Sequence, residues 1–268
     1  VDVNYKKARE WYEKAAEQGH ADAQFNLGTM YQHGHGVDVN YKKAIEWYEK
    51  AAEQGHALAQ FNLGLMYYHG QGVNVNYKKA FEWYEKAAKQ GYARAQFNLG
   101  QMYYDGRGVN VNYKKSREWY KKAAEQGYAL ARYNLGQMYY DGRGVDVNYK
   151  KAREWYEKAA EQEHAKAQFS LGVMYIKGQG VDVHYKKAFE WYKKAAKQGY
   201  APAQYNLGAM YHNGHGVDVN YKKAIEWYKK AAEQGLVDAQ YNLGAMYKNG
   251  HGVDVNYKKA FEWYKKAA

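Results

Sequence analysis

The sequence predicts an all-α fold, a right-handed α/α solenoid (superhelix) of 36-residue helix-turn-helix repeats. The first observation is the period. The stretch from Val1 to Gly36 is followed by six more copies without an insertion or deletion, and a partial copy of 16 residues completes the chain of 268. A fixed period of this length is typical of stacked helical repeats. The second observation is that apolar residues recur within each copy at helical spacing, which predicts two helices per repeat.

The first helix of each copy is expected to start after Asn4 and to stop near Gly19. Tyr5, Ala8 and Tyr12 fall on one helical face, which is the pattern of a buried stripe. Asparagine is a good N-cap because its side chain accepts a hydrogen bond from an amide of the first turn. The same position holds asparagine in all but one of the later copies: Asn40, Asn76, Asn112, Asn148, His184, Asn220 and Asn256.

The second helix is expected at about residues 21–32, followed by a loop with two glycines. Its apolar side holds Ala23, Leu27 and Met30, and Gly28 lies among them. A glycine within a helix costs roughly 1 kcal/mol relative to alanine. Because all seven copies keep this glycine, we expect a close helix crossing at Gly28 in which a side chain would not fit.

The composition excludes several classes of function. The chain has no cysteine, two serines and one threonine, so we expect no thiol or hydroxyl nucleophile and no cysteine-bound metal centre. No apolar run approaches the ~20 residues of a membrane helix, and we expect no membrane span. Neighbouring histidines such as His33 and His35 supply two ligands, fewer than a zinc site needs. Nearly every titratable residue recurs in each copy, whereas an active site is an asymmetric cluster. We therefore expect neither an enzyme nor a bound cofactor.

The chain resembles a known family at the pattern A-x-A-Q-x-N-L-G-x-M-Y-x-x-G-x-G-V, followed by Y-K-K-A-x-E-W-Y-x-K-A-A-x-Q-G. This pattern is similar, over essentially the whole chain, to the Sel-one-like repeat (SLR), a relative of the tetratricopeptide repeat. The resemblance implies that each unit starts at the L-G helix. A single solenoid domain (residues 1–268) is then expected to hold an unpaired leading helix at 1–20 and seven hairpins at about 21–56, 57–92, 93–128, 129–164, 165–200, 201–236 and 237–268.

Differences between the internal copies select one surface of the second helix. Positions 22, 29, 32 and 33 vary between copies, and Phe25 and Asn26 lie beside them at spacings that put all six on one helical face. The six positions and their equivalents in later copies are named the variable face. The resemblance implies that this face lines the concave groove in which tetratricopeptide proteins bind extended peptides. The candidate peptide-binding residues are Leu58, Asn62, Leu65, Tyr68, Arg94, Asn98, Gln101, Tyr104, Leu130, Asn134, Gln137, Tyr140, Lys166, Val173 and Ile176.

Two series on the variable face also have a structural interpretation. The amides of Asn26 and its equivalents can hold a peptide backbone or bond the neighbouring repeat, and the sequence leaves both open. The aromatic series that begins with Phe25 is expected to pack between repeats. Tyr68, Tyr104 and Tyr140 are better candidates for contact, because their position varies between copies.

The net charge of +12 comes largely from lysines that recur in every copy. Lys6, Glu10 and Lys14 stand four residues apart, so we expect a solvated face of weak i, i+4 ion pairs rather than a nucleic-acid site. Arg94 and Lys166 replace uncharged or acidic residues of other copies. They favour a partner that is acidic or carries a free C-terminal carboxylate.

The sequence therefore predicts a non-enzymatic adaptor or scaffold that binds a protein or an extended peptide along the concave face. Two alternatives stay open. One is an idealised or designed consensus repeat with no native ligand. The other, less favoured, is a nucleic-acid-binding array of helical repeats, which would need covarying pairs of polar residues in each repeat. Because the first and last helices keep the amphipathic pattern of the internal ones, we also expect apolar ends and head-to-tail self-association.

Overall fold

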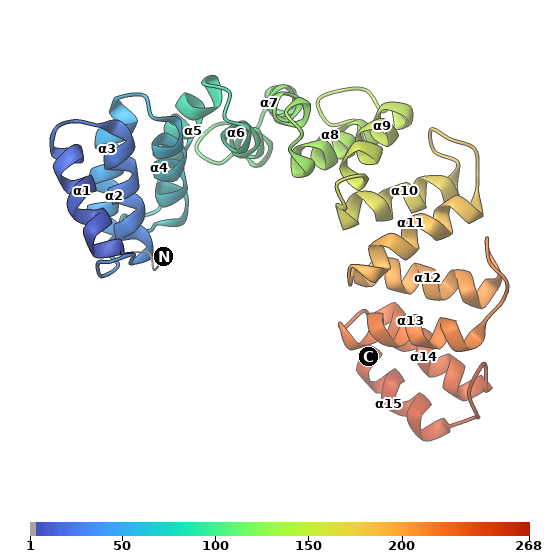
Figure 1. The fold of residues 1–268 in the computed structure, drawn as a ribbon. Helices are drawn as coiled ribbons and strands as arrows, with labels where there is room; N and C mark the ends of the chain where they lie inside the picture. Colours follow the sequence, from blue (N-terminus) through green and yellow to red (C-terminus); the bar gives the residue numbers. More distant parts are fainter. Residues whose placement is uncertain (1–3) are drawn as a thin grey trace. The chain divides into compact units, whose positions relative to one another are not determined.

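The computed structural model describes residues 4–268, and within that range it contains fifteen helices and no strand. The helices follow one another as hairpins joined by short loops (Figure 1). The helices that start with Y-K-K, here named YKK helices, are α1 (Tyr5–Glu17), α3 (Tyr41–Glu53), α5 (Tyr77–Lys89), α7 (Tyr113–Glu125), α9 (Tyr149–Ala160), α11 (Tyr185–Lys197), α13 (Tyr221–Glu233) and α15 (Tyr257–Ala267). The helices that contain L-G, here named LG helices, are α2 (Ala21–His33), α4 (Ala57–His69), α6 (Ala93–Asp105), α8 (Ala129–Asp141), α10 (Ala165–Lys177), α12 (Ala201–Asn213) and α14 (Val237–Asn249).

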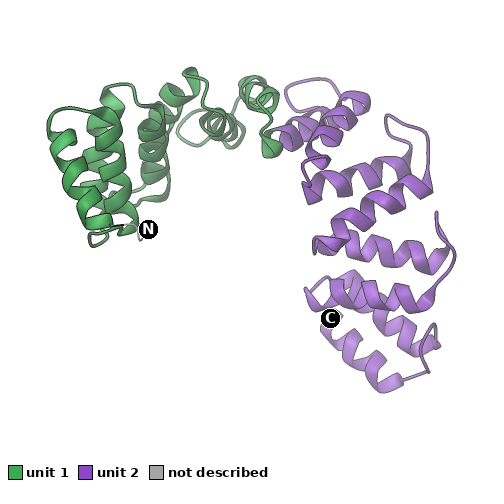
Figure 2. Cartoon of the chain, viewed as in Figure 1, with its two compact units in different colours: residues 1–131 green, residues 132–268 purple. Residues whose placement is uncertain are grey.

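The helices group into two compact units, one ending at Ala131 and the other comprising Arg132–Ala268 (Figure 2). Within each unit, YKK and LG helices alternate and pack as tandem pairs. The prediction of an all-α solenoid of 36-residue helix pairs is confirmed. That the whole chain forms one domain stays a prediction.

The YKK helices start where their caps predict. The side chain of Asn40 accepts a hydrogen bond from the amide of Lys43 at 3.0 Å, and the other cap asparagines do the same. His184, which replaces asparagine, also caps its helix, because its Nδ1 accepts a hydrogen bond from the amide of Lys187 at 3.3 Å. Each cap thus satisfies an amide that the first turn leaves without a helical partner.

The mid-helix glycine allows the LG helix to lie directly on a tyrosine of the following YKK helix. A Cβ atom added at Gly28 would stand 2.7 Å from the ring of Tyr48, closer than two carbon atoms can pack. Among the described residues, Tyr48 and its equivalents Tyr84, Tyr120 and Tyr156 are the largest fully buried side chains. The expected close crossing is confirmed, and it explains why the helix keeps a residue of poor helical propensity.

A buried glutamine in the LG helix links three successive helices. The amide of Gln24 donates to the carbonyl of Ala16 at 3.0 Å, and its oxygen accepts from the side chain of Gln54 at 2.7 Å. The same pair of bonds recurs at Gln60, which donates to the carbonyl of Ala52 and accepts from the side chain of Gln90. Because a buried amide without partners is costly, these bonds set the register between neighbouring helices.

The last glycine of each loop allows a close approach to the preceding repeat. Gly36 has a φ of 72°, in the left-handed region, and a Cβ there would stand 2.8 Å from the backbone of Tyr5. The loop therefore packs on backbone at the start of the YKK helix of the preceding repeat, where no side chain would fit.

The terminal helices expose apolar rings, as expected. Trp11 is 70% exposed and Phe261 is 68% exposed, whereas Phe189, equivalent to Phe261, is buried in the second unit. Self-association through these ends stays a prediction. None of the helices within residues 4–268 combines the length and the apolar character that crossing a membrane requires.

Candidate functional site

The aromatic series of the variable face packs between repeats, as expected. The ring of Phe61 on α4 lies 5.8 Å from that of Tyr84 on α5 and 5.0 Å from that of Tyr92, which precedes α6. The guanidinium of Arg94 lies over the same Phe61 ring at 5.2 Å. These rings therefore join neighbouring repeats, and Arg94 is held where its exposed charge faces the same surface.

Buried tyrosines of the YKK helices extend their hydroxyl groups to the variable face, where amide side chains cover several of them. Tyr120 donates to the side-chain oxygen of Gln101 at 2.8 Å, and Tyr156 donates to that of Gln137 at 3.0 Å. Both glutamines were predicted to contact a peptide. In the structure each also closes the surface above a tyrosine of its own unit.

The asparagine series lies beside the same hydroxyl groups. Asn98 hydrogen-bonds Tyr84 of the preceding repeat, and Asn206 hydrogen-bonds Tyr192. Asn242 donates to Tyr205 at 3.4 Å. These contacts between repeats favour the structural role of the asparagines over the alternative of a free ladder for a peptide backbone.

The hydroxyl groups are uncharged at neutral pH. Burial raises the pKa of Tyr192 to about 12, although the hydrogen bond from Asn206 opposes this. Burial and the neighbouring Tyr205 raise the pKa of Tyr228 to about 12, and the bond with Asn242 again opposes the rise. The variable face thus presents neutral polar groups over a buried aromatic layer.

A first pocket lies on the variable face of the first unit, between α4 and α6. It has a volume of about 180 Å³, and Tyr84 of α5 contributes to its lining. Four of the predicted residues come together here, and the full lining is Leu65, Tyr68, His69, Tyr84, Asn98 and Gln101.

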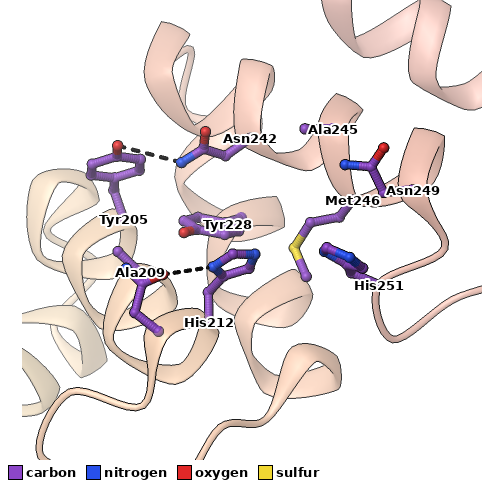
Figure 3. Close-up of a pocket in the computed structure, with 10 residues that line it drawn as sticks. Tyr205, Ala209, His212, Tyr228, Asn242, Ala245, Met246, Asn249 and His251 are labelled. Atoms are coloured by element: carbon purple, nitrogen blue, oxygen red, sulfur yellow. Dashed lines mark hydrogen bonds between the residues drawn. The ribbon is translucent and has the colours of Figure 1, made fainter.

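A larger pocket, of about 390 Å³, lies in the same register between α12 and α14 of the second unit (Figure 3). Its lining comprises Tyr205, Ala209, His212, Asn213, Tyr228, Asn242, Ala245, Met246, Asn249 and His251. None of these is among the fifteen predicted peptide-binding residues, although Asn242 belongs to the asparagine series and most of the lining stands on the variable face. The available signal was the small side chain of Ala209 and Ala245 at a position that holds glutamine in Gln101 and Gln137.

The other predicted residues lie on the same face without joining either pocket. Leu58 and Leu130 are 39% and 43% exposed, and Arg94 and Lys166 are exposed as well. Tyr104 packs edge-on against Tyr113 at 5.2 Å. The remaining members, which are half-buried, are Asn62, Asn134, Gln137, Tyr140, Val173 and Ile176.

The expected i, i+4 pairing of Lys6, Glu10 and Lys14 is wrong. Within residues 4–268 the ion pairs of the YKK helices join other positions, such as Arg9 with Glu13 at 3.3 Å. Lys14 and its equivalents instead lie over the tryptophan three residues earlier, at 4.0–5.1 Å from the ring centroid in all eight YKK helices. Helical spacing permits both contacts, and a cation over an indole is worth at least as much as an exposed ion pair. Lysines engaged with tryptophan weaken the nucleic-acid alternative.

Metal-ligating side chains do not gather in the part of the chain that the structure describes. Within residues 4–268, no three histidine, aspartate or glutamate side chains stand close enough to hold one ion. His33 and His35 form a pair with ring centroids 5.8 Å apart.

The comparison with known proteins decides the family. The model of the Sel1 repeat matches eight consecutive segments, at residues 1–20, 21–56, 57–92, 93–128, 129–164, 165–200, 201–236 and 237–268. The chain belongs to the Sel1 repeat family. A search of curated proteins returned no match.

Two solved structures of Sel1 repeat proteins are similar along nearly the whole chain. One is a protein of uropathogenic Escherichia coli, described as a protective antigen displaying an SLR fold, with 39% identity and a TM-score of 0.94 over 99% of this chain and 56% of that one. The other is a Sel1 repeat protein from Oxalobacter formigenes, with 36% identity and a TM-score of 0.81 over 99% of this chain and 78% of that one. The chain thus spans just over half the length of the Escherichia coli protein. Sel1 repeats form a scaffold that is generally non-catalytic and commonly serves protein interaction.

Proposed function

We propose that this Sel1 repeat chain is a non-enzymatic adaptor or scaffold that binds a protein or an extended peptide along its variable face. The observation that carries the proposal is a coincidence of two independent properties. The face of the LG helix that differs between otherwise near-identical repeats also holds two pockets in the same register. A further hollow of about 360 Å³ lies along α11, so the repeated register, not the presence of a hollow, carries the argument. Positions that packing fixes stay constant between repeats, whereas positions that vary are either solvated or selected for a partner, and the two pockets on this face favour a partner.

The exposed residues of this face suggest the chemistry of the partner. Leu58 and Leu130 offer exposed apolar side chains, while Arg94 and Lys166 offer cations. A peptide with apolar residues and either acidic side chains or a free C-terminal carboxylate would complement this surface.

The test selects peptides from a displayed random library on the intact protein and measures their dissociation constants by fluorescence anisotropy. Combined replacement of Leu58, Arg94, Leu130 and Lys166 by alanine is expected to weaken binding at least about tenfold, because a few exposed anchors dominate such interfaces. All four side chains are exposed, so the helical circular dichroism should not change.

The matched control replaces four exposed lysines of YKK helices, Lys42, Lys78, Lys114 and Lys186, by alanine. It removes more charge than the first variant but leaves the variable face intact. Peptides that lose affinity in the control and keep it in the first variant would overturn the proposal.

A further inference from the structure

The larger pocket exists because two alanines stand where other repeats have longer side chains. Ala209 and Ala245 are equivalent to Gln101 and Gln137, whose amides cover the tyrosines of their own repeats. Among the described residues no glutamine covers Tyr228, whose hydroxyl group is bonded by Asn242 of the next LG helix, and the hollow of about 390 Å³ extends to the buried side chains of Tyr228 and Met246.

The walls of this pocket are aromatic. The rings of Tyr205 and Tyr228 lie 5.7 Å apart, and those of His212 and His251 lie 5.8 Å apart (Figure 3). Tyr221 stacks on His251 from outside the pocket at 4.8 Å. Aromatic groups favour other rings in offset or edge-to-face geometry, and the thioether of Met246 on the floor also favours a ring.

Hydrogen bonds hold two of the wall rings in place. His212 Nδ1 and the side-chain oxygen of Asn213 are 2.9 Å apart, and Asn242 donates to the hydroxyl of Tyr205 at 3.4 Å (Figure 3). A wall fixed before binding loses little conformational entropy when the ligand enters.

Charge and size restrict the occupant. The lining includes no lysine, arginine, aspartate or glutamate, and with His212 and His251 in the neutral form the pocket offers a charged group no partner of opposite sign. Its volume is within the ≈300–1,000 Å³ typical of ligand pockets. The pocket beside Tyr84, narrowed by Leu65 and Gln101, has only about 180 Å³. A cavity of roughly 150 Å³ already holds benzene, so the larger pocket accommodates a ring together with the atoms that link it to a chain.

From these observations we infer that the pocket between α12 and α14 binds one uncharged aromatic side chain of the partner peptide. The inference rests on the proposed function and adds to it an anchor residue and the place where the anchor binds. The amide of Asn249 at the pocket is available to the peptide backbone beside the anchored ring.

A fragment of the partner tests the inference directly. The probe is N-acetyltyrosinamide, with N-acetylleucinamide as the aliphatic comparison and adenosine as the nucleobase comparison. The seven methionines occur once per LG helix, so methyl-labelled methionine gives seven signals, with Met246 as the reporter and the other six as internal controls. We expect the tyrosine amide to shift the Met246 signal in a saturable manner. A stronger response to adenosine or to the leucine amide, or equal shifts of all seven signals, would overturn the inference.

A substitution borrowed from the chain's own repeats closes the pocket. Ala209→Gln places in α12 the residue that α6 carries as Gln101, so the fold is expected to accept it. The affinity for the tyrosine amide, measured from the shift of the Met246 signal, should fall at least about tenfold. Val237→Gln, on α14 but outside the pocket, is the matched control and should leave the response unchanged.

The library peptides separate failure of this inference from failure of the proposed function. If selected peptides lack aromatic residues and bind the Ala209→Gln variant unchanged, but lose affinity when the exposed residues of the variable face are replaced, the pocket is not their anchor and the proposed function stands. If no peptide is selected although the tyrosine amide binds, the proposed function fails instead.

Discussion

The surroundings of Tyr120 and Tyr228 show how one scaffold gives a closed surface in one repeat and a hollow in another. Both tyrosines are buried and pack on a glycine, with a Cβ atom added at Gly100 or Gly208 standing 2.7 or 2.8 Å from the ring. The hydroxyl group of Tyr120 donates a hydrogen bond to the side-chain oxygen of Gln101, which covers it. Above Tyr228 lies the larger pocket instead. The comparison shows that the layer of glycine and tyrosine is the same in both repeats, and that side chains of the variable face decide whether the surface above it is covered or hollow.

The largest expected effect comes from breaking the constant layer. Gly208→Val adds atoms within 2.8 Å of the Tyr228 ring, and the overpacked crossing should lower the free energy of unfolding by about 1–3 kcal/mol. Urea denaturation followed by circular dichroism measures the change. Ala209→Val is the control, because the equivalent position already holds Val173. Equal stability of the two variants would show that the crossing of α12 and α13 at Gly208 can accommodate a side chain.

A smaller effect is expected from removing the hydroxyl groups. Tyr120→Phe takes away the donor to Gln101 and should cost about 1 kcal/mol in the free energy of unfolding. Tyr228→Phe should cost less, because that hydroxyl group lies at the open pocket beside Asn242 and, within residues 4–268, donates to no glutamine. Thermal and urea unfolding of the two variants side by side gives the comparison. A larger loss for Tyr228→Phe would contradict the assignment of the open and closed surfaces.

A change of similar or smaller size is expected in a loop where one repeat has a side chain at a position of positive φ and the others have glycine. Glu163 has a φ of 59° at a position that is glycine in every other repeat. Glu163→Gly should raise the free energy of unfolding by about 0.5–1 kcal/mol, because the left-handed conformation strains any residue with a side chain. Gly199→Ala, with a φ of 86° and no atom near its added Cβ, should lower stability by a similar amount. Changes of the same sign in both variants would contradict this.

The smallest signal is expected from alkaline titration, because few of the 32 tyrosines are affected. Burial raises the pKa of Tyr192 and Tyr228 to about 12, above the ordinary value of about 10. The folded protein then binds more protons than the unfolded chain between pH 10 and pH 12, so this contribution to stability is complete below pH 10 and is lost as pH rises toward 12. Absorbance of tyrosinate should show a late fraction that decreases in Tyr228→Phe. An unchanged late fraction would contradict the assignment.

Much of the fold could be predicted from single residues that favour one local structure. The cap asparagines, the mid-helix glycine and the helical spacing of the apolar residues each predict one local structure, and each is confirmed. The buried glutamine of the LG helix is less legible from sequence, because a polar residue beside apolar ones does not reveal that Ala16 and Gln54 are its partners.

The candidate site was only partly visible in the sequence, because a hollow arises where side chains are missing. Inspection of the variable face favours large or charged residues such as Tyr68 and Arg94. Ala209 and Ala245 look unremarkable in a helix, yet their small size creates the larger pocket. The lysine contacts were misjudged for a different reason: Lys14 can reach Glu10 or Trp11 along the same helix, and only the choice of rotamer decides between them.

The loop glycine that packs on the backbone of the preceding repeat has a consequence for the gene. At Gly216 as at Gly36, the atoms approached are main-chain atoms of a tyrosine one repeat earlier, so the contact takes no account of which copy supplies them. Unequal crossing-over between copies, in whole steps of 36 codons, would therefore leave each junction intact. The number of repeats could then change by recombination without disturbing the stacking, whereas each pocket, which two successive LG helices line, would be kept only if both of its repeats move together.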